Sequence, residues 1–338
     1  MRSVKFGAVY PIYGEKRADW KAILEYAKAS EAYGYDMLLV NDHFVNWTLF
    51  CDMKQWFTRK LVYKSEDAVD WTVKDAFSLD GWTTLTALAA ATSTIRLGTY
   101  VLCNQFRHPS QLARMVSTLD FISGGRVDLG LGAGWLKKEF RMFGMDWAPL
   151  HARLERLRES IRIMKALWQG NNVSFSGKYY TLSEANLEPK PIQKPHPPII
   201  VGGVIKEVRD IAAELGDGWI PEGLSAGEFS QGIEYIKAKA AESGRDPNKI
   251  LAVWGGGDLY NIIDHNEAGV KTAVRSVSGE SDIPLNSLHW IIGTPRQCVD
   301  KIESYVKAGA THVVIGFPDF PSTHSLELFA KSVIPSFR

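Results

Sequence analysis

The chain contains 338 residues, of which 45% are hydrophobic and 23% are charged, as in an ordinary globular protein. Its 39 basic and 38 acidic side chains give a formal charge of +1, so neither a nucleic acid nor an anionic membrane is expected as a partner. No apolar run is long enough to span a bilayer, and charged residues occur too early at the N-terminus for a signal peptide. Three widely spaced cysteines form neither a disulfide framework nor a zinc motif, which favours the cytoplasm.

Short apolar segments alternate with longer amphipathic segments along the chain. The apolar segments, which we expect to be strands, are 4–11, 36–43, 95–104, 125–135, 197–203, 218–221, 249–257 and 311–317. The amphipathic segments, which we expect to be helices, are 19–36, 80–94, 108–123, 150–170, 206–218, 226–244, 294–310 and 325–337. Asp80 and Thr294 are predicted to cap their helices, and Pro109 and Pro295 are predicted to lie in first helical turns.

The order and character of these segments restrict the fold. The apolar runs are continuous rather than alternating, which indicates strands that are buried on both faces. An open doubly wound sheet and a closed (β/α)8 barrel both provide such strands. Eight strand–helix units without a dinucleotide-binding fingerprint favour the α/β barrel, as one domain over residues 1–338.

Three insertions interrupt the alternation: 44–80 after the second strand, 171–197 near the fifth and 258–290 near the seventh. The first holds eight aromatic residues, and the second resembles a hairpin that turns at Ser176-Gly177. Loops after the strands of a (β/α)8 barrel lie at its catalytic face. Segment 44–80 is therefore either an aromatic lid over a planar ligand, or extra packing or a subunit contact. The insertions carry no pattern that identifies a substrate.

The second strand ends in an ionisable pair, Asp42-His43, and Trp47 follows four residues after the histidine. Of the eight histidines, only His43 ends a predicted barrel strand beside a carboxylate. Imidazole titrates near neutral pH, so His43 suits proton transfer. The alternative is a buried histidine whose ring is satisfied by Asp42 or by a backbone carbonyl. The opposite strand ends, such as Ile95-Arg96 and Arg126-Val127, are expected to support the fold.

Glycines collect where the fourth and fifth strands end. Gly130, Gly132 and Gly134 recur with the two-residue period of a strand, so one face of that strand lacks side chains. Either a flat cofactor ring occupies the space or neighbouring strands pack tightly there. Gly202-Gly203 opens into a helix, where free backbone N–H groups provide a site for a phosphate.

Other chemistries lack their motifs. The chain has no His-x-His, H-E-x-x-H or clustered Cys/His spacing, so no metal site is expected. It also has no P-loop and no G-x-S-x-G nucleophile elbow. Trp135 ends the segment GLGAGW, which is therefore not the G-x-G-x-x-G of a dinucleotide-binding fold.

Several segments, in sequence order, resemble the luciferase-like monooxygenase superfamily, which includes the deazaflavin-dependent oxidoreductases. They are "NDHFVNW", "FRHPSQLARMVSTLDFISGGRVDLGLGAGW", "EFRMFGMDW…R…RLRESIRIMKALW", "FSGKYYTL", "LEPKPIQKPHPPIIVGG", "AAELGDGWIP" and "GTPRQCVDKIESYVKAGATHVVIGF". Together they extend over most of residues 4–220 and 290–318. The resemblance implies a (β/α)8 barrel with a flavin or deazaflavin at its C-terminal mouth.

The resemblance also implies roles for individual residues. Asp42, His43 and Trp47 match a pattern of the deazaflavin-dependent dehydrogenases, in which the histidine transfers a proton and the aspartate lies against the cofactor. A non-proline cis peptide often ends the third strand of this family, and Tyr100 to Cys103 is the matching stretch. The cofactor-binding residues are therefore expected to be Asp42, Val101, Cys103, Asn104, Gly132, Gly134, Gly202 and Gly203, with a phosphate at the last two.

The chain departs from the family at one position. The sugar-phosphate and alcohol dehydrogenases of this group have a glutamate directly after the second glycine of G-x-G in strand four, where this chain has Trp135. The acid partner of their hydride chemistry is therefore missing at that position. This version of the segment is more similar to the broad reductase and monooxygenase branches.

We therefore expect an oxidoreductase that uses coenzyme F420 for hydride transfer to or from a small organic substrate. His43 is the expected catalytic acid or base, and Trp47 and Trp135 are expected in the substrate pocket. The alternative is a monooxygenase that uses reduced FMN and oxygen. A third hypothesis is a barrel that binds flavin without catalysis, or that has lost the cofactor and serves a structural or storage role. The family often forms dimers, so a homodimer is expected.

Overall fold

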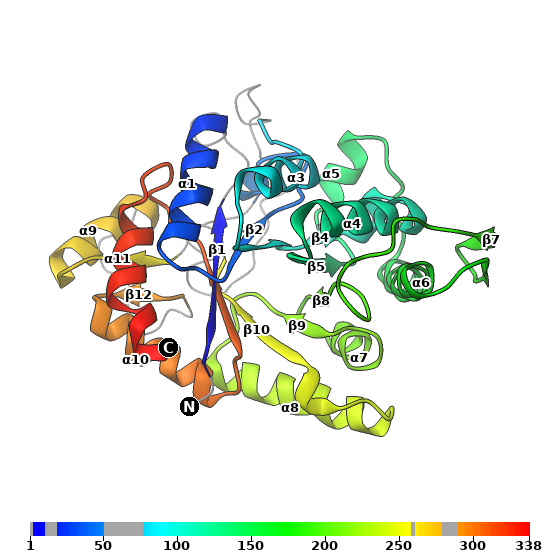
Figure 1. Ribbon diagram of the computed structural model, residues 1–338. Helices are drawn as coiled ribbons and strands as arrows, with labels where there is room; N and C mark the ends of the chain where they lie inside the picture. Colours follow the sequence, from blue (N-terminus) through cyan, green and yellow to red (C-terminus); the bar gives the residue numbers. More distant parts are fainter. Residues whose placement is uncertain (1–2, 11–18, 51–76, 258–260, 279–289) are drawn as a thin grey trace.

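Eight parallel strands close into a barrel, as the apolar segments predict. The computed structural model describes residues 3–10, 19–50, 77–257, 261–278 and 290–338. The barrel strands are β1 (Lys5–Tyr10), β2 (Met37–Val40), β3 (Arg96–Thr99), β5 (Val127–Gly132), β8 (Ile199–Gly202), β9 (Gly218–Ile220), β10 (Leu251–Gly255) and β13 (His312–Ile315). Each pairs in parallel with the next, and β13 pairs with β1, which closes the ring (Figure 1). The predicted (β/α)8 barrel is confirmed.

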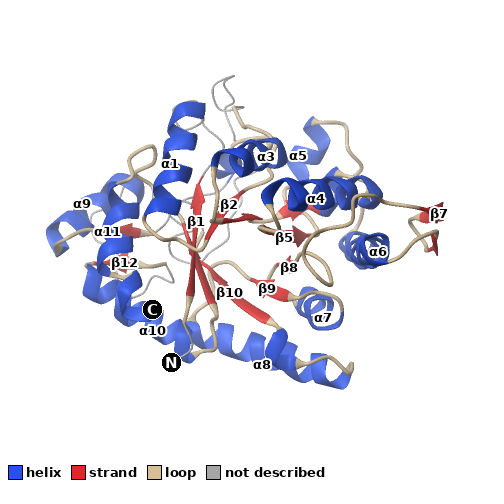
Figure 2. Ribbon diagram, viewed as in Figure 1, coloured by secondary structure: helices blue, strands red, loops and turns tan. Residues whose placement is uncertain are grey.

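Helices surround the barrel, because each crossover between parallel strands returns along its outside (Figure 2). The helices that follow barrel strands are α1 (Trp20–Ala32), α3 (Gly81–Ala91), α4 (Pro109–Ser123), α6 (Leu150–Gln169), α7 (Lys206–Glu214), α8 (Ala226–Glu242), α10 (Pro295–Lys307) and α11 (His324–Ser332). Asp80 caps α3 by accepting a hydrogen bond of 2.7 Å from the Thr83 N–H. Pro109 begins α4, and Thr294 and Gln297 form a capping box at α10. These four helix-start predictions therefore agree with the structure.

The insertions contain secondary structure of their own. The hairpin of segment 171–197 consists of β6 (Val173–Ser176) and β7 (Thr181–Ala185), and it extends beyond α6 in Figure 1. Segment 258–290 contains a helix that its weak periodicity did not predict, α9 (Glu267–Ser278), and its first strand, β11 (Ile262–Ile263), pairs with β12 (Ile292–Gly293). The predicted strand 95–104 is divided into β3 and a short second strand, β4 (Leu102–Cys103), and the short helix α5 (Lys137–Met142) was not predicted. Most of the aromatic insertion, residues 51–76, lies outside the described residues.

Two apolar layers hold the barrel together. The larger layer joins the helices to the outward side chains of the strands, and every residue of β2 and β5 is buried. The smaller layer fills the barrel interior with Val9, Met37, Leu39, Ile200, Ile220, Val253 and Val314. Above this plug, the carboxyl ends of the strands surround an open space, where the predicted site residues lie. Within the described ranges, no helix combines the length and apolar character needed to cross a membrane.

Candidate active site

The central ionisable group of the site is a histidine–glutamate pair. His43 follows β2, and its Nδ1 lies 3.1 Å from Oε2 of Glu139, on α5. Oε1 of Glu139 accepts hydrogen bonds from the backbone N–H groups of Phe44 and Val45. The Glu139 side chain is 2% exposed and that of His43 is 16% exposed. Oε2 of Glu139 is placed to accept a hydrogen bond from His43 Nδ1–H, so Nε2 is the ring nitrogen left for the cavity that His43 lines.

Asp42 does not serve as the partner of His43, contrary to the alternative drawn from the sequence. Its carboxylate forms a bidentate ion pair with Arg107, at 2.7 and 3.0 Å, and accepts a hydrogen bond of 3.1 Å from the Cys103 N–H. Burial raises the pKa of Asp42, and the attraction of Arg107 limits that rise. Arg107 also pairs with Asp80 at 3.0 Å. Asp42 therefore joins the end of β2 to the end of β4.

An aromatic group surrounds His43. The centroid of the Trp135 ring lies 5.6 Å from that of His43 and 5.7 Å from that of Trp47, with both contacts edge-to-face. The His43 and Trp47 rings lie 6.0 Å apart. Trp47 is 4% exposed and Trp135 is 38% exposed, so Trp47 supports the histidine from within and Trp135 is the more accessible wall. Trp135 thus occupies the place of the family's glutamate, and Glu139, four residues later, supplies a carboxylate to His43.

Val101 forms the floor of the space above the barrel interior. The expected cis peptide is present between Tyr100 and Val101. A Cβ atom added at Gly132 or Gly202 would lie 3.0 or 2.8 Å from the Val101 side chain. At Gly130 the added atom would lie 2.0 Å from the Thr99 carbonyl oxygen, so tight strand packing explains that glycine. Gly132 and Gly202 instead leave room for Val101 and expose bare backbone beside it.

The turn between β8 and α7 offers backbone donors at the start of the helix that follows Gly202-Gly203, but not at Gly203 itself. Gly203 has a φ of 133°, which favours glycine. Its N–H donates to the Ile220 carbonyl at 3.3 Å, and its carbonyl accepts from the Trp219 indole at 2.7 Å. Ile205, the N-cap of α7, provides no side-chain capping bond, so the N–H groups of the first turn of α7 are the donors that suit an anion.

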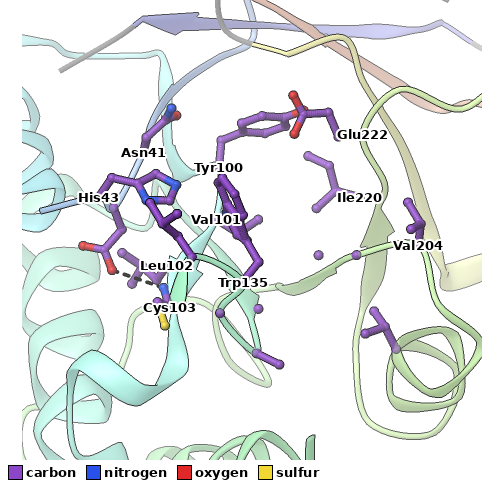
Figure 3. Close-up of a pocket in the computed structure, with 18 of the residues that line it drawn as sticks. Asn41, His43, Tyr100, Val101, Leu102, Cys103, Trp135, Val204, Ile220 and Glu222 are labelled. Carbon is purple, nitrogen blue, oxygen red and sulfur yellow. Dashed lines mark hydrogen bonds between the residues drawn. The ribbon is translucent and has the colours of Figure 1, made fainter. Parts of the chain in front are cut away.

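A cavity of about 700 Å³ joins these groups (Figure 3). Figure 3 shows Asn41 and His43 on one side, Val204, Ile220 and Glu222 on the other, and Tyr100 with Val101 between them. Ten of the eleven predicted site residues line it: Asp42, His43, Trp47, Val101, Cys103, Gly132, Gly134, Trp135, Gly202 and Gly203. Asn104 is not among them. It is 1% exposed, and its amide has no hydrogen-bond partner among the described residues.

The sequence does not assign several residues of the site to it, although Glu139 begins the segment EFRMFGMDW that resembles the family. Glu139 lies 96 residues from His43 in the chain, and only the fold brings α5 beside β2. Arg107 and Arg153 stand in segments that resemble the family or adjoin them, yet no local spacing connects them to the site. Glu222 and Trp290 enter the wall from the later strands.

The residues present fit a planar redox cofactor. The cavity volume lies within the range of small-molecule sites, roughly 300–1,000 Å³. Val101, Gly132 and Gly202 provide a floor without long side chains, and the first turn of α7 provides donors for a phosphate at the margin.

Comparisons with known proteins agree with this description. Residues 5–275 match the family model described as luciferase-like monooxygenase. The F420-dependent glucose-6-phosphate dehydrogenase of Amycolatopsis mediterranei (strain U-32) is 28% identical over 340 residues, which cover 94% of each chain. The FMNH(2)-dependent dimethylsulfone monooxygenase of Pseudomonas putida is 28% identical over 287 residues, or 75% of this chain and 77% of that protein.

A solved structure shares the fold over its whole length. The structure of an F420-dependent secondary alcohol dehydrogenase, in complex with an F420-acetone adduct, matches with a TM-score of 0.79 at 21% identity and covers 99% of both chains. The family model covers most of the chain, and the barrel has the architecture that the resemblance implied. The chain belongs to the luciferase-like monooxygenase family.

Proposed function

We propose that the protein is an oxidoreductase that binds coenzyme F420 at the C-terminal mouth of its barrel and acts on a small organic substrate. The observation that carries the proposal is the His43–Glu139 pair at the edge of a cavity with a bare floor. Relatives that use F420 align over 94% of the chain, whereas the relative that uses FMNH(2) aligns over 75%. This difference in coverage favours F420 over FMN.

The residues of the chain divide the work as follows. Val101, Gly132, Gly202 and the first turn of α7 would hold the cofactor. When bound, F420 supplies or accepts a hydride, whereas reduced FMN would support reaction with oxygen. His43 holds or releases the accompanying proton at Nε2, because Glu139 occupies Nδ1.

The aromatic and acidic neighbours support these roles. Trp47 and Trp135 exclude water from one side of the imidazole, which strengthens its interactions with a bound substrate. Asp42 holds the end of β4, and with it Val101 and Cys103, in place for the cofactor.

Cofactor titration tests the proposal. Purified protein is titrated with oxidised F420 and, separately, with FMN, and binding is followed by cofactor fluorescence. Saturable F420 binding that is at least tenfold tighter than FMN binding supports the proposal. The reverse preference supports the monooxygenase alternative, and saturable binding of neither cofactor contradicts both and favours a barrel without redox function.

The wider organisation of the protein is also proposed. We infer one barrel domain over residues 1–338, a homodimer as the assembly and the cytoplasm as the location. Light scattering tests the homodimer, because a monomer at micromolar concentration contradicts it.

A further inference from the structure

The cavity wall is apolar over most of its described surface. Beside the aromatic group at His43, it is formed by Phe106, Phe140, Leu150, Leu154, Leu224 and Trp290. Such a wall stabilises a ligand by removing its apolar surface from water, at about 25 cal/mol per Å². It offers few partners to a ligand that carries many hydroxyl groups or a phosphate, and each unpaired polar group of such a ligand costs binding energy.

The one cation among the described residues of the wall is already committed to the protein. Among the lining residues within the described part of the chain, Arg153 is the only lysine or arginine. It is 7% exposed, and it donates hydrogen bonds to the carbonyls of Ala133, Gly134 and Ala148. Its guanidinium also lies 3.8 Å from the centroid of the Trp147 ring. Arg153 therefore holds the loop that carries Trp135 and is occupied by that role.

Carboxylates outnumber cations among the lining residues that the structure describes. Asp42 is neutralised by Arg107, and Glu139 by its bonds to His43 and two backbone groups. Glu228, whose side chain caps α8 through Ser225, and Glu222 add two further carboxylates. Among the described lining residues, no lysine or arginine is left for a phosphate dianion, whereas anion recognition in proteins relies on arginine, lysine or helix N-termini. The first turn of α7 is assigned to the cofactor under the proposed function.

We infer that the substrate of this site is an uncharged, predominantly apolar molecule with one oxygen function for His43, and that a sugar phosphate is excluded. The inference rests on the proposed function, because it treats the helix terminus as occupied by the cofactor. It separates this chain from the relatives named for glucose 6-phosphate, although their sequences align along nearly its whole length.

Ligand binding to the cofactor-loaded protein tests the inference without depending on turnover. Calorimetric titrations use cyclohexanol and cyclohexanone as uncharged apolar ligands, glucose as an uncharged polar ligand, and glucose 6-phosphate. We expect saturable binding of at least one cyclohexyl compound, and a dissociation constant for glucose 6-phosphate at least 100-fold higher. Glucose should also bind weakly, since its hydroxyl groups find few partners. Glucose 6-phosphate binding as tight as that of the cyclohexyl compounds, or no binding of either cyclohexyl compound, overturns the inference.

A charge variant isolates the missing cation as the cause. Leu150 lines the cavity at the start of α6 and is 45% exposed, so a longer polar side chain is accommodated there. Leu150→Lys should tighten glucose 6-phosphate binding at least tenfold, and the matched neutral variant Leu150→Gln should not. Equal glucose 6-phosphate affinity in the two variants overturns the electrostatic explanation.

The cofactor titration keeps the two proposals distinguishable. If F420 binds but glucose 6-phosphate is preferred, the substrate inference fails and the proposed function stands. If F420 does not bind, the proposed function fails before any substrate is added, and the substrate inference fails with it.

Discussion

The two ends of the barrel carry similar charged residues in different surroundings. At the N-terminal end, Arg96 donates to both oxygens of Asp128 at 2.7 Å, and Asp36 accepts from Lys5 and Arg338 at about 3 Å. Each of these carboxylates is in direct contact with a side chain that stays positively charged. They close the bottom of the barrel and join the two chain termini, as expected from the ends at Ile95-Arg96 and Arg126-Val127.

At the C-terminal end, the corresponding pair is a carboxylate with a titratable imidazole, and a cavity lies beside it. Glu139 is as deeply buried as Asp128, but its partner His43 retains a second nitrogen on the cavity. The presence of a charge pair therefore does not by itself distinguish a pair that stabilises the fold from a pair that takes part in a reaction. The difference lies in whether the pair leaves one proton-binding atom beside open space.

The largest expected effect is the loss of turnover when His43, at the C-terminal end of the barrel, is replaced. His43→Asn should lower kcat about 100-fold or more, because the side chain no longer transfers a proton near neutral pH. Cofactor affinity and the unfolding midpoint should stay near those of the wild type. Steady-state kinetics, followed by F420 absorbance, measures the loss, and unchanged turnover eliminates His43 as the proton carrier.

The next largest effect is a loss of stability when an ion pair at the N-terminal end of the barrel is removed. Arg96→Met removes the partner of the buried Asp128 carboxylate and should lower the free energy of unfolding by about 2–3 kcal/mol. Turnover of the folded fraction should not change, because the pair lies at the far end of the barrel. Urea denaturation measures the change, and adding Asp128→Asn should restore part of the stability. An unchanged urea midpoint in Arg96→Met contradicts the assignment.

A third change sharpens the comparison within the reactive pair. Glu139→Gln places an amide beside His43 Nδ1 and so favours the wrong tautomer, which should lower kcat about tenfold to thirtyfold. Steady-state kinetics measures the loss, and urea denaturation measures stability. A role in folding alone would lower stability without lowering the kcat of the folded protein.

A fourth change addresses the phosphate end with a matched pair of variants. Ile205→Asp and Ile205→Asn should both cap α7, but only the aspartate places a negative charge beside the bound phosphate. We expect Ile205→Asp to raise the cofactor dissociation constant about tenfold, with Ile205→Asn close to the wild type. Gly203 is a poorer position for this test, because its φ of 133° strains any other residue. Equal cofactor affinities in the two variants would show that the phosphate does not bind at the start of α7.

The smallest effect concerns a surface carboxylate near the supporting end. Burial opposes ionisation of Glu31, but hydrogen bonds from Ser93, Thr94 and Ile95 lower its pKa to about 2. Because the folded pKa lies below that of the unfolded chain, this stabilisation is present above about pH 4.3 and is lost as the pH falls towards 2. Glu31→Gln should cost about 1 kcal/mol at neutral pH, and the difference should vanish near pH 2 in urea denaturation. A difference that persists at pH 2 contradicts this origin.

The sequence predicts the barrel well, because strand periodicity, helix caps and continuous apolar runs are local signals. It also places His43, Trp47 and Trp135 at one rim, since strand ends follow from the strands. It does not reveal Glu139 or Arg107 as partners, because those contacts depend on which crossover loops meet above the barrel. The helix α9 is missed since only Val270 and Val274 of its residues are buried, which leaves a weak pattern. Asn104 is expected in the site as the end of the predicted strand 95–104, but it begins a short helical turn, is buried and does not line the cavity.

The contact between Val101 and its glycine neighbours links three strands through one shared volume. A methyl group at Gly202 would come within 2.8 Å of Val101, and one at Gly132 within 3.0 Å. Substitutions that reshape the cavity floor are therefore coupled. A larger residue at Gly132 on β5 or at Gly202 on β8 requires a smaller residue at position 101. Directed evolution that varies these positions one at a time will meet losses at each step, whereas libraries that vary them jointly reach new floor shapes directly.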